Sequence, residues 1–281
     1  MDNRPKTIQI FLPEGSPSGI KIAHITSRMT QAVLIPRSQL QEASKRDEVK
    51  QVGLYFLFGI SEDGSKPQVY VGEAENCYDR LLQHHKQKDF WNVAIAFTTK
   101  ALLFTKAHVK FLESHAFQQL VEKKRYEVVN DIVPTQSYVP EPDMADLYDH
   151  FDTIKLLLTT LGYPAFDGLQ RPEEKDLFYC QRKGFASKGE YTSEGFVVLS
   201  GSQMPKEVVK SVEGTTVPKV RRRLMEDAIV IDRGDHYVFN ENHLFSSPST
   251  AASVVMGRSA NGWIEWKDKQ GRTLHERKRR G

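Results

Sequence analysis

Two aromatic-rich segments separated by a short polar loop constrain the fold of this chain most strongly. Residues 53–59 (GLYFLFG) and 68–72 (QVYVG) are rich in aromatic residues, leucine and valine, a composition typical of strands. The loop that joins them contains the run Glu62-Asp63-Gly64-Ser65, and glycine and short polar residues are favoured in turns. The pattern therefore predicts a β-hairpin.

Strands and helices are both expected around this hairpin. Further strands are predicted at 7–12, 20–25, 32–35 and 91–98. Helices are predicted at 38–50, 76–88 and 105–124, with Ser38 and Asn76 as N-caps for the first two. We expect an α+β fold in which a small antiparallel sheet is flanked by helices, preceded by an N-terminal small β segment and followed by a C-terminal α+β module.

The second half of the chain begins with an acidic helix and then returns to strands. Apolar residues at helical spacing predict an amphipathic helix over 143–162. Strands are expected at 177–180 and 195–199, a helix at 217–228 and a closing hairpin at 263–274. Residues 141–180 carry 9 acidic and 3 basic side chains, whereas residues 181–281 carry 18 basic and 12 acidic ones. This asymmetry indicates modules with different surfaces.

A proline-punctuated loop divides the two halves. Pro134, Pro140 and Pro142 lie in it, and such a cluster is typical of a boundary. We expect four parts: an N-terminal β-rich segment packed on the core (1–50), a core domain (51–140), an acidic helical connector (141–175) and a C-terminal α+β accessory domain (176–281).

The composition excludes several classes of protein. With 281 residues, 39% of them hydrophobic and 27% charged, the chain resembles neither a disordered nor a collagen-like protein. The only cysteines, Cys77 and Cys180, are too few for a disulfide framework and are expected to be buried thiols. The sequence contains no signal-peptide pattern and no run long enough to span a membrane. We therefore expect a cytoplasmic protein with no membrane partner.

Polar residues suited to phosphodiester cleavage follow the hairpin. Arg80 lies ten residues after Tyr70, and His84 lies four residues after Arg80, so the two share one face of a helix. Glu113 lies mid-way along the helix predicted at 105–124, and Asn130 comes after it.

These residue types match the needs of the reaction. A planar guanidinium contacts two phosphate oxygens at once, and a single carboxylate with water and phosphate oxygens suits Mg²⁺. Either Tyr55 or His84 is a candidate to take the proton of the attacking water. Tyr55 needs strongly cationic surroundings for this role, because a free tyrosine has a pKa of about 10.

Segment 53–130 resembles the GIY-YIG nuclease superfamily. The two name-giving motifs appear as Gly53-Leu54-Tyr55 and Tyr70-Val71-Gly72. Leucine and valine replace the isoleucines, and the intervening loop is somewhat long. The resemblance implies a metal-dependent endonuclease that hydrolyses DNA, or RNA as the alternative substrate, and leaves 5′-phosphate and 3′-hydroxyl ends.

The resemblance also implies roles for single residues and a biological setting. Glu113 would bind Mg²⁺ or Mn²⁺, and Tyr55 would be the general base. The implied catalytic set comprises Tyr55, Tyr70, Arg80, His84 and Asn130. A bacterial or archaeal enzyme of defence against foreign DNA, or of repair, is the expected setting.

The C-terminal part resembles a small α+β domain of unknown function that often accompanies GIY-YIG and restriction-modification proteins. The resemblance rests on residues 195–202, residues 253–263, Trp266 and residues 271–274. Three basic clusters are candidates for nucleic-acid contact. They are Lys123-Lys124-Arg125, Arg221-Arg222-Arg223 and Arg277-Lys278-Arg279-Arg280. A role in solubility explains the last cluster equally well.

Two other interpretations stay open at this point. The chain is alternatively a catalytically inactive nucleic-acid-binding protein, or a scaffold that uses the same fold to recruit a partner. The sequence leaves the oligomeric state and the structure or sequence preference for a substrate undetermined.

Overall fold

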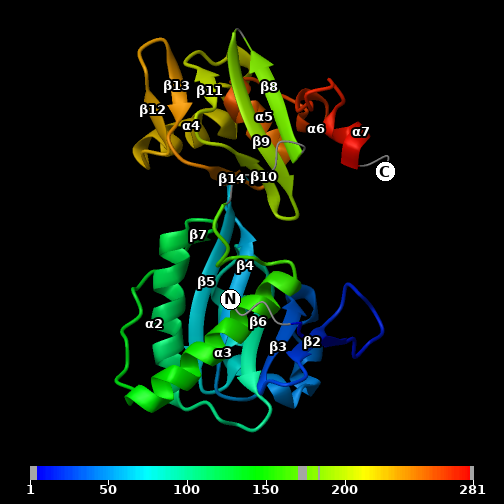
Figure 1. Ribbon diagram of the computed structural model, residues 1–281, viewed down its shortest axis with the longest axis vertical. Helices are drawn as coiled ribbons and strands as arrows, with labels where there is room; N and C mark the ends of the chain where they lie inside the picture. Colours follow the sequence, from blue (N-terminus) through cyan, green and yellow to red (C-terminus); the bar gives the residue numbers. More distant parts are fainter. Residues whose placement is uncertain (1–4, 170–175, 183, 279–281) are drawn as a thin grey trace. The chain divides into compact units, whose positions relative to one another are not determined.

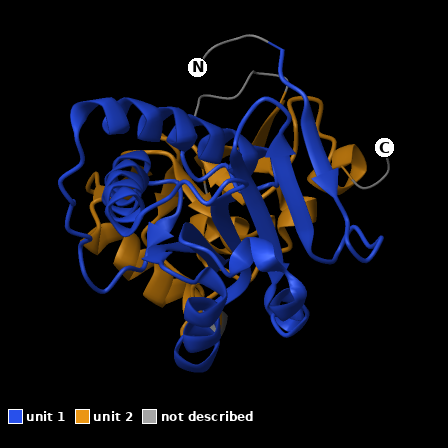
Figure 2. Cartoon of the chain, turned by 90° about the horizontal axis from the view of Figure 1, so that it is seen from below, with its two compact units in different colours: residues 1–59, 68–167 blue, residues 60–67, 168–281 orange. Residues whose placement is uncertain are grey.

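The computed structural model describes residues 5–169, 176–182 and 184–278. It divides into two compact units (Figure 2). Unit 1 comprises residues 1–59 and 68–167, and unit 2 comprises residues 60–67 and 168–281. Unit 2 thus contains the loop of the hairpin whose strands belong mostly to unit 1. No helix in the described ranges has the length and apolar character that a bilayer crossing requires.

A seven-stranded sheet with the order β1-β2-β3-β6-β4-β5-β7 forms the centre of unit 1. Its strands are β1 (Ile8–Phe11), β2 (Lys21–Ile25), β3 (Thr30–Pro36), β4 (Gly53–Ile60), β5 (Pro67–Ala74), β6 (Trp91–Thr99) and β7 (Glu127–Val128). The pairs β1–β2, β2–β3, β3–β6 and β6–β4 are antiparallel, whereas β7 runs parallel to β5. The strands expected in this half of the chain are therefore confirmed.

Helices cover both faces of this sheet. They are α1 (Cys77–Gln87), α2 (Lys106–Lys123) and α3 (Glu141–Thr160). The side chain of Asn76 accepts a hydrogen bond from the backbone N–H of Asp79, and that of Thr105 accepts one from His108. These caps supply partners for N–H groups that lack one at a helix start, so both helices begin where the sequence predicts.

The alternation of side chains along β4 creates the two layers of the core. Leu54, Phe56 and Phe58 point to one face, where α2 and α3 pack (Figure 1), and Tyr55 and Leu57 point to the other, where α1 packs. All five side chains are at most 2% exposed. Because successive side chains of a strand point to opposite faces, a central strand covered on both sides must be apolar throughout. Tyr55 is therefore the exception that needs hydrogen-bond partners.

The outer edge of β5 is only partly covered. β7 pairs with Gln68 and Val69 alone. In place of a further strand residue, Asn130 contacts Val71: its Oδ1 accepts from the Val71 N–H at 3.1 Å, and its Nδ2 donates to the Val71 carbonyl at 2.7 Å. This side-chain amide continues the ladder for one residue and holds β5 in register beside Tyr70.

The described residues of unit 2 form two smaller sheets and four short α-helices. The sheets have the orders β14-β10-β9-β8 and β11-β13-β12. Their strands are β8 (Leu177–Arg182), β9 (Phe185–Thr192), β10 (Gly195–Val198), β11 (Gln203–Pro205), β12 (Val230–Asp232), β13 (His236–Phe239) and β14 (His243–Phe245). The helices are α4 (Thr216–Glu226), α5 (Pro248–Met256), α6 (Gly262–Glu265) and α7 (Leu274–Lys278). The expected α+β class is confirmed in both units.

Trp266 lies at the centre of the core of unit 2. Its ring stacks on Phe196 with centroids 4.2 Å apart, and its Nε1 donates to the Pro248 carbonyl at 3.0 Å. Residues 60–67 are bound to this unit through β14, because the backbone N–H of Ser246 donates to the Ser65 carbonyl at 2.9 Å. The loop of the hairpin is thus a structural part of unit 2.

Two predictions of local structure were wrong. Residues 38–50 form three 3₁₀ turns, Arg37–Gln39, Glu42–Lys45 and Asp47–Val49, and no α-helix. The backbone of Arg46 is extended, with φ −106° and ψ 112°, which ends any continuous helix. The hairpin expected at 263–274 is not formed. Residues Gly262–Glu265 are helical, with Asn261 as the N-cap of α6, and Lys267 and Thr273 are joined by an isolated bridge.

The expected boundaries also require correction. Residues 1–50 are no separate segment, because β3 pairs with β6 over seven residues of the central sheet. The acidic helix is no connector either: Leu147, Phe151 and Ile154 of α3 are at most 2% exposed in the core of unit 1. Both segments bury apolar side chains that the sheet would otherwise expose to water.

Truncation tests whether the N-terminal strands are integral to unit 1. Deleting residues 1–36 would expose the edge of β6 and remove the buried Val33 and Ile35, so we expect the cooperative thermal transition of unit 1 to disappear. Deleting residues 1–12 removes only β1, whose Ile10 and Phe11 are exposed, and should leave the transition in place. Equal transitions for the two truncated chains, followed by near-ultraviolet circular dichroism, would contradict the corrected boundary.

Candidate active site

A cavity of about 430 Å³ lies at the open part of the β5 edge. Tyr55 of β4, Tyr70 and Glu73 of β5, Arg80 of α1 and Glu113 of α2 all contribute to its lining. Helices α1 and α2 cover opposite faces of the sheet, and they meet here because the outer edge of β5 has no strand partner beyond Val69 among the described residues. Four of the residues predicted from sequence, which are far apart along the chain, therefore share one cavity.

The hydroxyl group of Tyr55 is contacted by two other residues of the site. Tyr55 is 1% exposed. Its hydroxyl oxygen accepts a hydrogen bond from Nε of Arg80 at 3.3 Å and lies 2.8 Å from Nε2 of His84. Arg80 and His84 reach the same atom because they are one helical turn apart on α1. The prediction that they share a helix face is confirmed.

Both glycines of the two motifs are required by close packing. A Cβ atom at Gly72 would lie 2.3 Å from the Tyr55 hydroxyl oxygen. A Cβ atom at Gly53 would lie 2.5 Å from the Phe97 carbonyl oxygen. Any side chain at Gly72 would therefore displace the phenol ring from Arg80 and His84.

His84 is held as a neutral base beneath Tyr55. The residue is 2% exposed, and burial, with the charges of Arg80 and Lys88, lowers the pKa of its imidazole to about 4. His84 is absent from the lining of the cavity, so it communicates with a ligand there through Tyr55. Its Nδ1 is buried and has no hydrogen-bond partner among the described residues.

Tyr55 itself is far from ionisation. Burial raises the pKa of its phenol well above the usual value, the neighbouring Tyr70 adds to the rise, and Arg80 opposes it. Arg80 supplies the positive charge that a tyrosine base needs, but its effect on the pKa of Tyr55 is smaller than that of burial. A phenolate at Tyr55 is therefore unfavourable. Tyr55 can pass on its proton without forming one only if it receives another proton at the same time.

Tyr70 lies beside the other two rings. Its ring is 6.2 Å from that of Tyr55, at an interplanar angle of 22°, and 5.0 Å from the imidazole of His84. The ammonium of Lys88 lies 5.0 Å from the centroid of the Tyr70 ring and pairs with Asp131 at 2.9 Å. This cation–π contact holds Tyr70 at the cavity wall.

Glu113 extends from α2 to the backbone of β5. The backbone N–H of Glu73 donates to the Glu113 carboxyl group, so this side chain reaches the edge strand of the sheet. Burial first, and then the charge of Glu73, raise the pKa of Glu113 to about 7. Lys106 and Lys110 oppose the rise. Two carboxyl groups therefore share one side of the cavity.

The cavity also contains Glu73 and Lys106, which the sequence analysis did not select. Nζ of Lys106 lies 2.8 Å from Oε2 of Glu73, and both residues line the cavity. The available signal was position, because Glu73 directly follows Tyr70-Val71-Gly72 and Lys106 is the first residue of α2. Their proximity depends on how α2 packs against β5, which no local pattern encodes.

The basic cluster Lys123-Lys124-Arg125 is not part of this cavity. Glu113 and Lys124 are separated along α2 by about 16 Å at the rise of an α-helix. Lys124 adopts the left-handed conformation that ends the helix, and Nη1 of Arg125 donates to the Asp167 carbonyl at 3.4 Å. These cations therefore lie away from the residues that line the cavity.

The cluster Arg221-Arg222-Arg223 is largely committed to unit 2. Arg221 is 4% exposed, and its guanidinium donates to the backbone carbonyls of Pro205 and Lys206. Arg223 lies 3.9 Å from Asp227. Of the three, only Arg222 is exposed, so Arg221 is withdrawn from the predicted nucleic-acid contacts. Of the last cluster, Arg279 and Arg280 lie outside the described residues.

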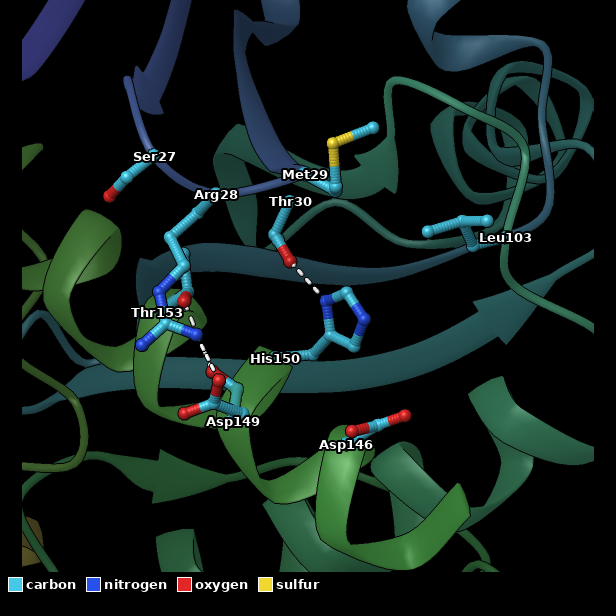
Figure 3. A pocket seen from close by; sticks show the side chains of 9 residues that line it. All are labelled: Ser27, Arg28, Met29, Thr30, Leu103, Asp146, Asp149, His150 and Thr153. Atoms are coloured by element: carbon cyan, nitrogen blue, oxygen red, sulfur yellow. Dashed lines mark hydrogen bonds and ion pairs between the residues drawn. The ribbon is translucent and has the colours of Figure 1, made fainter. Parts of the chain in front are cut away.

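A second cavity, of about 200 Å³, lies elsewhere in unit 1 (Figure 3). Nδ1 of His150 lies 2.6 Å from Oγ1 of Thr30, and the guanidinium of Arg28 pairs with Asp149. These polar groups bond to one another, and none of the catalytic or metal-binding residues predicted from the sequence lines this cavity. The cavity at the β5 edge is therefore the stronger candidate.

Comparison with known proteins identifies one region of the chain. Residues 178–278 match the model of a family described as a domain of unknown function (DUF4357). The chain has no match among curated proteins and none among solved structures. The matched range lies within unit 2, where the sequence resembles a domain of unknown function, and it contains none of the residues that line the cavity.

Burial of Glu113 predicts a pH-dependent stability. The folded protein retains the Glu113 proton up to about pH 7, whereas the unfolded chain loses it near 4.5. The unfolded state therefore binds fewer protons between these values, and stability falls as the pH rises through them. We expect Glu113→Gln, measured by urea unfolding at pH 8 with a chelator present, to raise the free energy of unfolding by about 1–3 kcal/mol.

A matched variant on the same helix controls for loss of charge. Glu122 is exposed, and Glu122→Gln should leave the unfolding midpoint at pH 8 unchanged. The gain from Glu113→Gln should shrink below about pH 4, where both states of the wild type hold the proton. A Glu113→Gln protein less stable than wild type at pH 8 would contradict the assignment of a buried charge.

Proposed function

We propose that the chain is a metal-dependent endonuclease of the GIY-YIG type that hydrolyses phosphodiester bonds of DNA. The observation that carries the proposal is the convergence of Arg80 and His84 on the Tyr55 hydroxyl, in a cavity that Glu113 also lines. Hydrogen bonding to the buried Tyr55 hydroxyl accounts for the contacts of Arg80 and His84, but it gives no reason for Glu113 and Glu73 to line the same cavity.

Arg80 is the group suited to the phosphate. Its Nε is bonded to Tyr55, and its Nη1 donates to Oε1 of Gln83 at 2.7 Å. These contacts hold the guanidinium plane at the cavity while its other donors stay available to oxygen atoms of a substrate. A fixed guanidinium stabilises the charge that develops on the phosphorus-bound oxygens in the transition state.

The proton of the attacking water passes to Tyr55 and His84 together. As the water oxygen bonds to phosphorus, its proton moves to the Tyr55 oxygen, and the Tyr55 proton moves to Nε2 of His84. The bond between phosphorus and the 3′ oxygen breaks, which leaves a 5′-phosphate and a 3′-hydroxyl that takes its proton from solvent. This path requires the neutral His84 tautomer that carries its proton on Nδ1, and it avoids a buried phenolate.

Glu113 is the residue proposed to bind Mg²⁺ or Mn²⁺. The donor set fits a hard cation, because carboxylate oxygens line this side of the cavity and Mg²⁺ retains several water ligands. No group of three or more His, Cys, Asp and Glu side chains within the described ranges is arranged to hold a metal. Water and substrate phosphate oxygens would supply the remaining ligands of an ion held by so few carboxylates. When bound, the ion supplies charge that stabilises the leaving oxygen.

Unit 2 is proposed to contribute to substrate capture. Residues 181–281 carry 18 basic and 12 acidic side chains, and Arg222 is exposed on α4. Positive surface attracts the phosphate backbone without regard to sequence. A role in defence against foreign DNA or in repair is consistent with cleavage by unit 1 and DNA binding by unit 2.

A plasmid-nicking assay tests the enzymatic proposal. We expect the full chain with Mg²⁺ to nick supercoiled DNA, and Arg80→Ala and Glu113→Ala to lower the rate by about 10²–10³-fold, the effect of removing one electrostatic contact to a transition state. Lys86→Ala removes an exposed cation from the same helix as Arg80 and should retain full activity. Equal rates for all four proteins, or no cleavage of any DNA or RNA substrate, would leave a non-enzymatic binding or scaffold role instead.

A double-mutant cycle tests the shared proton path. Tyr55→Phe should lower the single-turnover rate by about 10²–10⁴-fold, and His84→Gln by a comparable factor. Because His84 acts through the Tyr55 hydroxyl, the double variant should be no slower than Tyr55→Phe within about threefold. Tyr78→Phe, on the same helix as His84, is the control. Multiplicative losses in the double variant would show that the two residues act independently.

A further inference from the structure

Glu73 occupies an unusual position for a carboxylate. It is the second-last residue of β5, and its side chain is 12% exposed. Its Oε2 atom is buried and receives no hydrogen bond of good geometry from any described residue. The ammonium of Lys106, 2.8 Å away, is the cation that balances it.

The ion pair with Glu73 holds Lys106 at this place, whereas its position on α2 does not favour a cation. It is the first residue of the helix, where the partial positive charge of the helix dipole disfavours a cation. Its side chain is 44% exposed, and ion pairs with an exposed partner contribute little to stability. Lys106 can therefore leave Glu73 for solvent at small cost.

Glu113 approaches the same point from α2. Its carboxyl group accepts the backbone N–H of Glu73, and the charges of the two side chains interact. Lys106 brings one positive charge to this side of the cavity against two carboxylates. A divalent cation in place of the ammonium would balance both.

We propose that Glu73 is a second carboxylate ligand of the divalent cation. When no metal ion is bound, the ammonium of Lys106 forms an ion pair with the Glu73 carboxylate in its place. This inference rests on the proposed function, which assigns Glu113 to the metal. Binding of the ion exchanges one cation for another at Glu73, and Mg²⁺ sites with two carboxylates and several waters are common. Lys106 thereby keeps the buried carboxylate paired in the metal-free protein.

Mn²⁺ binding to the full chain tests the proposal without reference to activity. The free ion is measured by electron paramagnetic resonance at pH 8, without nucleic acid. We expect Lys106→Met to lower the Kd about 3–10-fold, because the competing ammonium is gone. Glu73→Gln should raise the Kd at least about 10-fold. In the Glu73→Gln background, Lys106→Met should have no further effect.

Lys110→Met is the matched control. Lys110 lies one turn later on α2, and its charge also acts on Glu113, but the described structure shows no ion pair between it and Glu73. If Lys110→Met increased the Mn²⁺ affinity equally, the loss of any nearby positive charge would explain the effect. The proposed exchange of Lys106 for the metal ion at Glu73 would then be refuted. Because the Lys106 side chain is partly exposed, its variant tests the exchange even if Glu73→Gln impairs folding, which circular dichroism of each variant monitors.

The outcomes separate this proposal from the one on which it rests. If Glu113→Gln weakens Mn²⁺ binding and Glu73→Gln does not, the second ligand is refuted and the proposed nuclease site stands. If neither variant changes Mn²⁺ binding, the metal assignment of the proposed function fails as well. An unchanged Kd in Lys106→Met refutes the exchange in either case.

Discussion

The buried hydroxyl group of Tyr55 is the constraint on which the arrangement of unit 1 depends. β4 is covered on both faces, and a phenol oxygen in that setting costs several kcal/mol unless it is hydrogen-bonded. Arg80 and His84 satisfy it, which sets the rotation of α1 about its own axis and its position along the strand. Gly72 must lack a side chain for the same reason. One polar atom in an apolar strand thus determines the packing of a helix and the identity of a residue on the next strand.

The open edge of β5 explains why the site lies where it does. A sheet edge normally has to be protected, and here β7 and the amide of Asn130 cover it only as far as Val71. Beyond that point α1 and α2, which pack on opposite faces, both reach the cavity. Two carboxyl groups are held close together there, which costs stability. Such a cost is expected where a fold keeps charges ready for a ligand.

Local patterns predicted the elements of this fold well and its assembly poorly. The strand alternation of residues 91–98, the cap at Asn76 and the helix that starts after Thr105 depend on neighbours in sequence, and each appears where expected. The 3₁₀ turns before β4, the insertion of residues 60–67 into unit 2 and the burial of Arg221 depend on distant contacts. No periodicity signals such contacts, so these predictions were wrong or were not made.

The sequence by itself determined which side chains could do chemistry. The order of Tyr55, Tyr70, Arg80, Glu113 and Asn130, with one helical turn between Arg80 and His84, follows from residue identity and spacing alone. The tertiary structure decided what surrounds them. It buried Tyr55 and His84, placed Glu73 and Lys106 beside Glu113, and removed Lys123-Lys124-Arg125 from the site. The reason is physical: spacing along a helix or strand sets the direction of a side chain, whereas burial and charge balance arise only when elements far apart in sequence pack together.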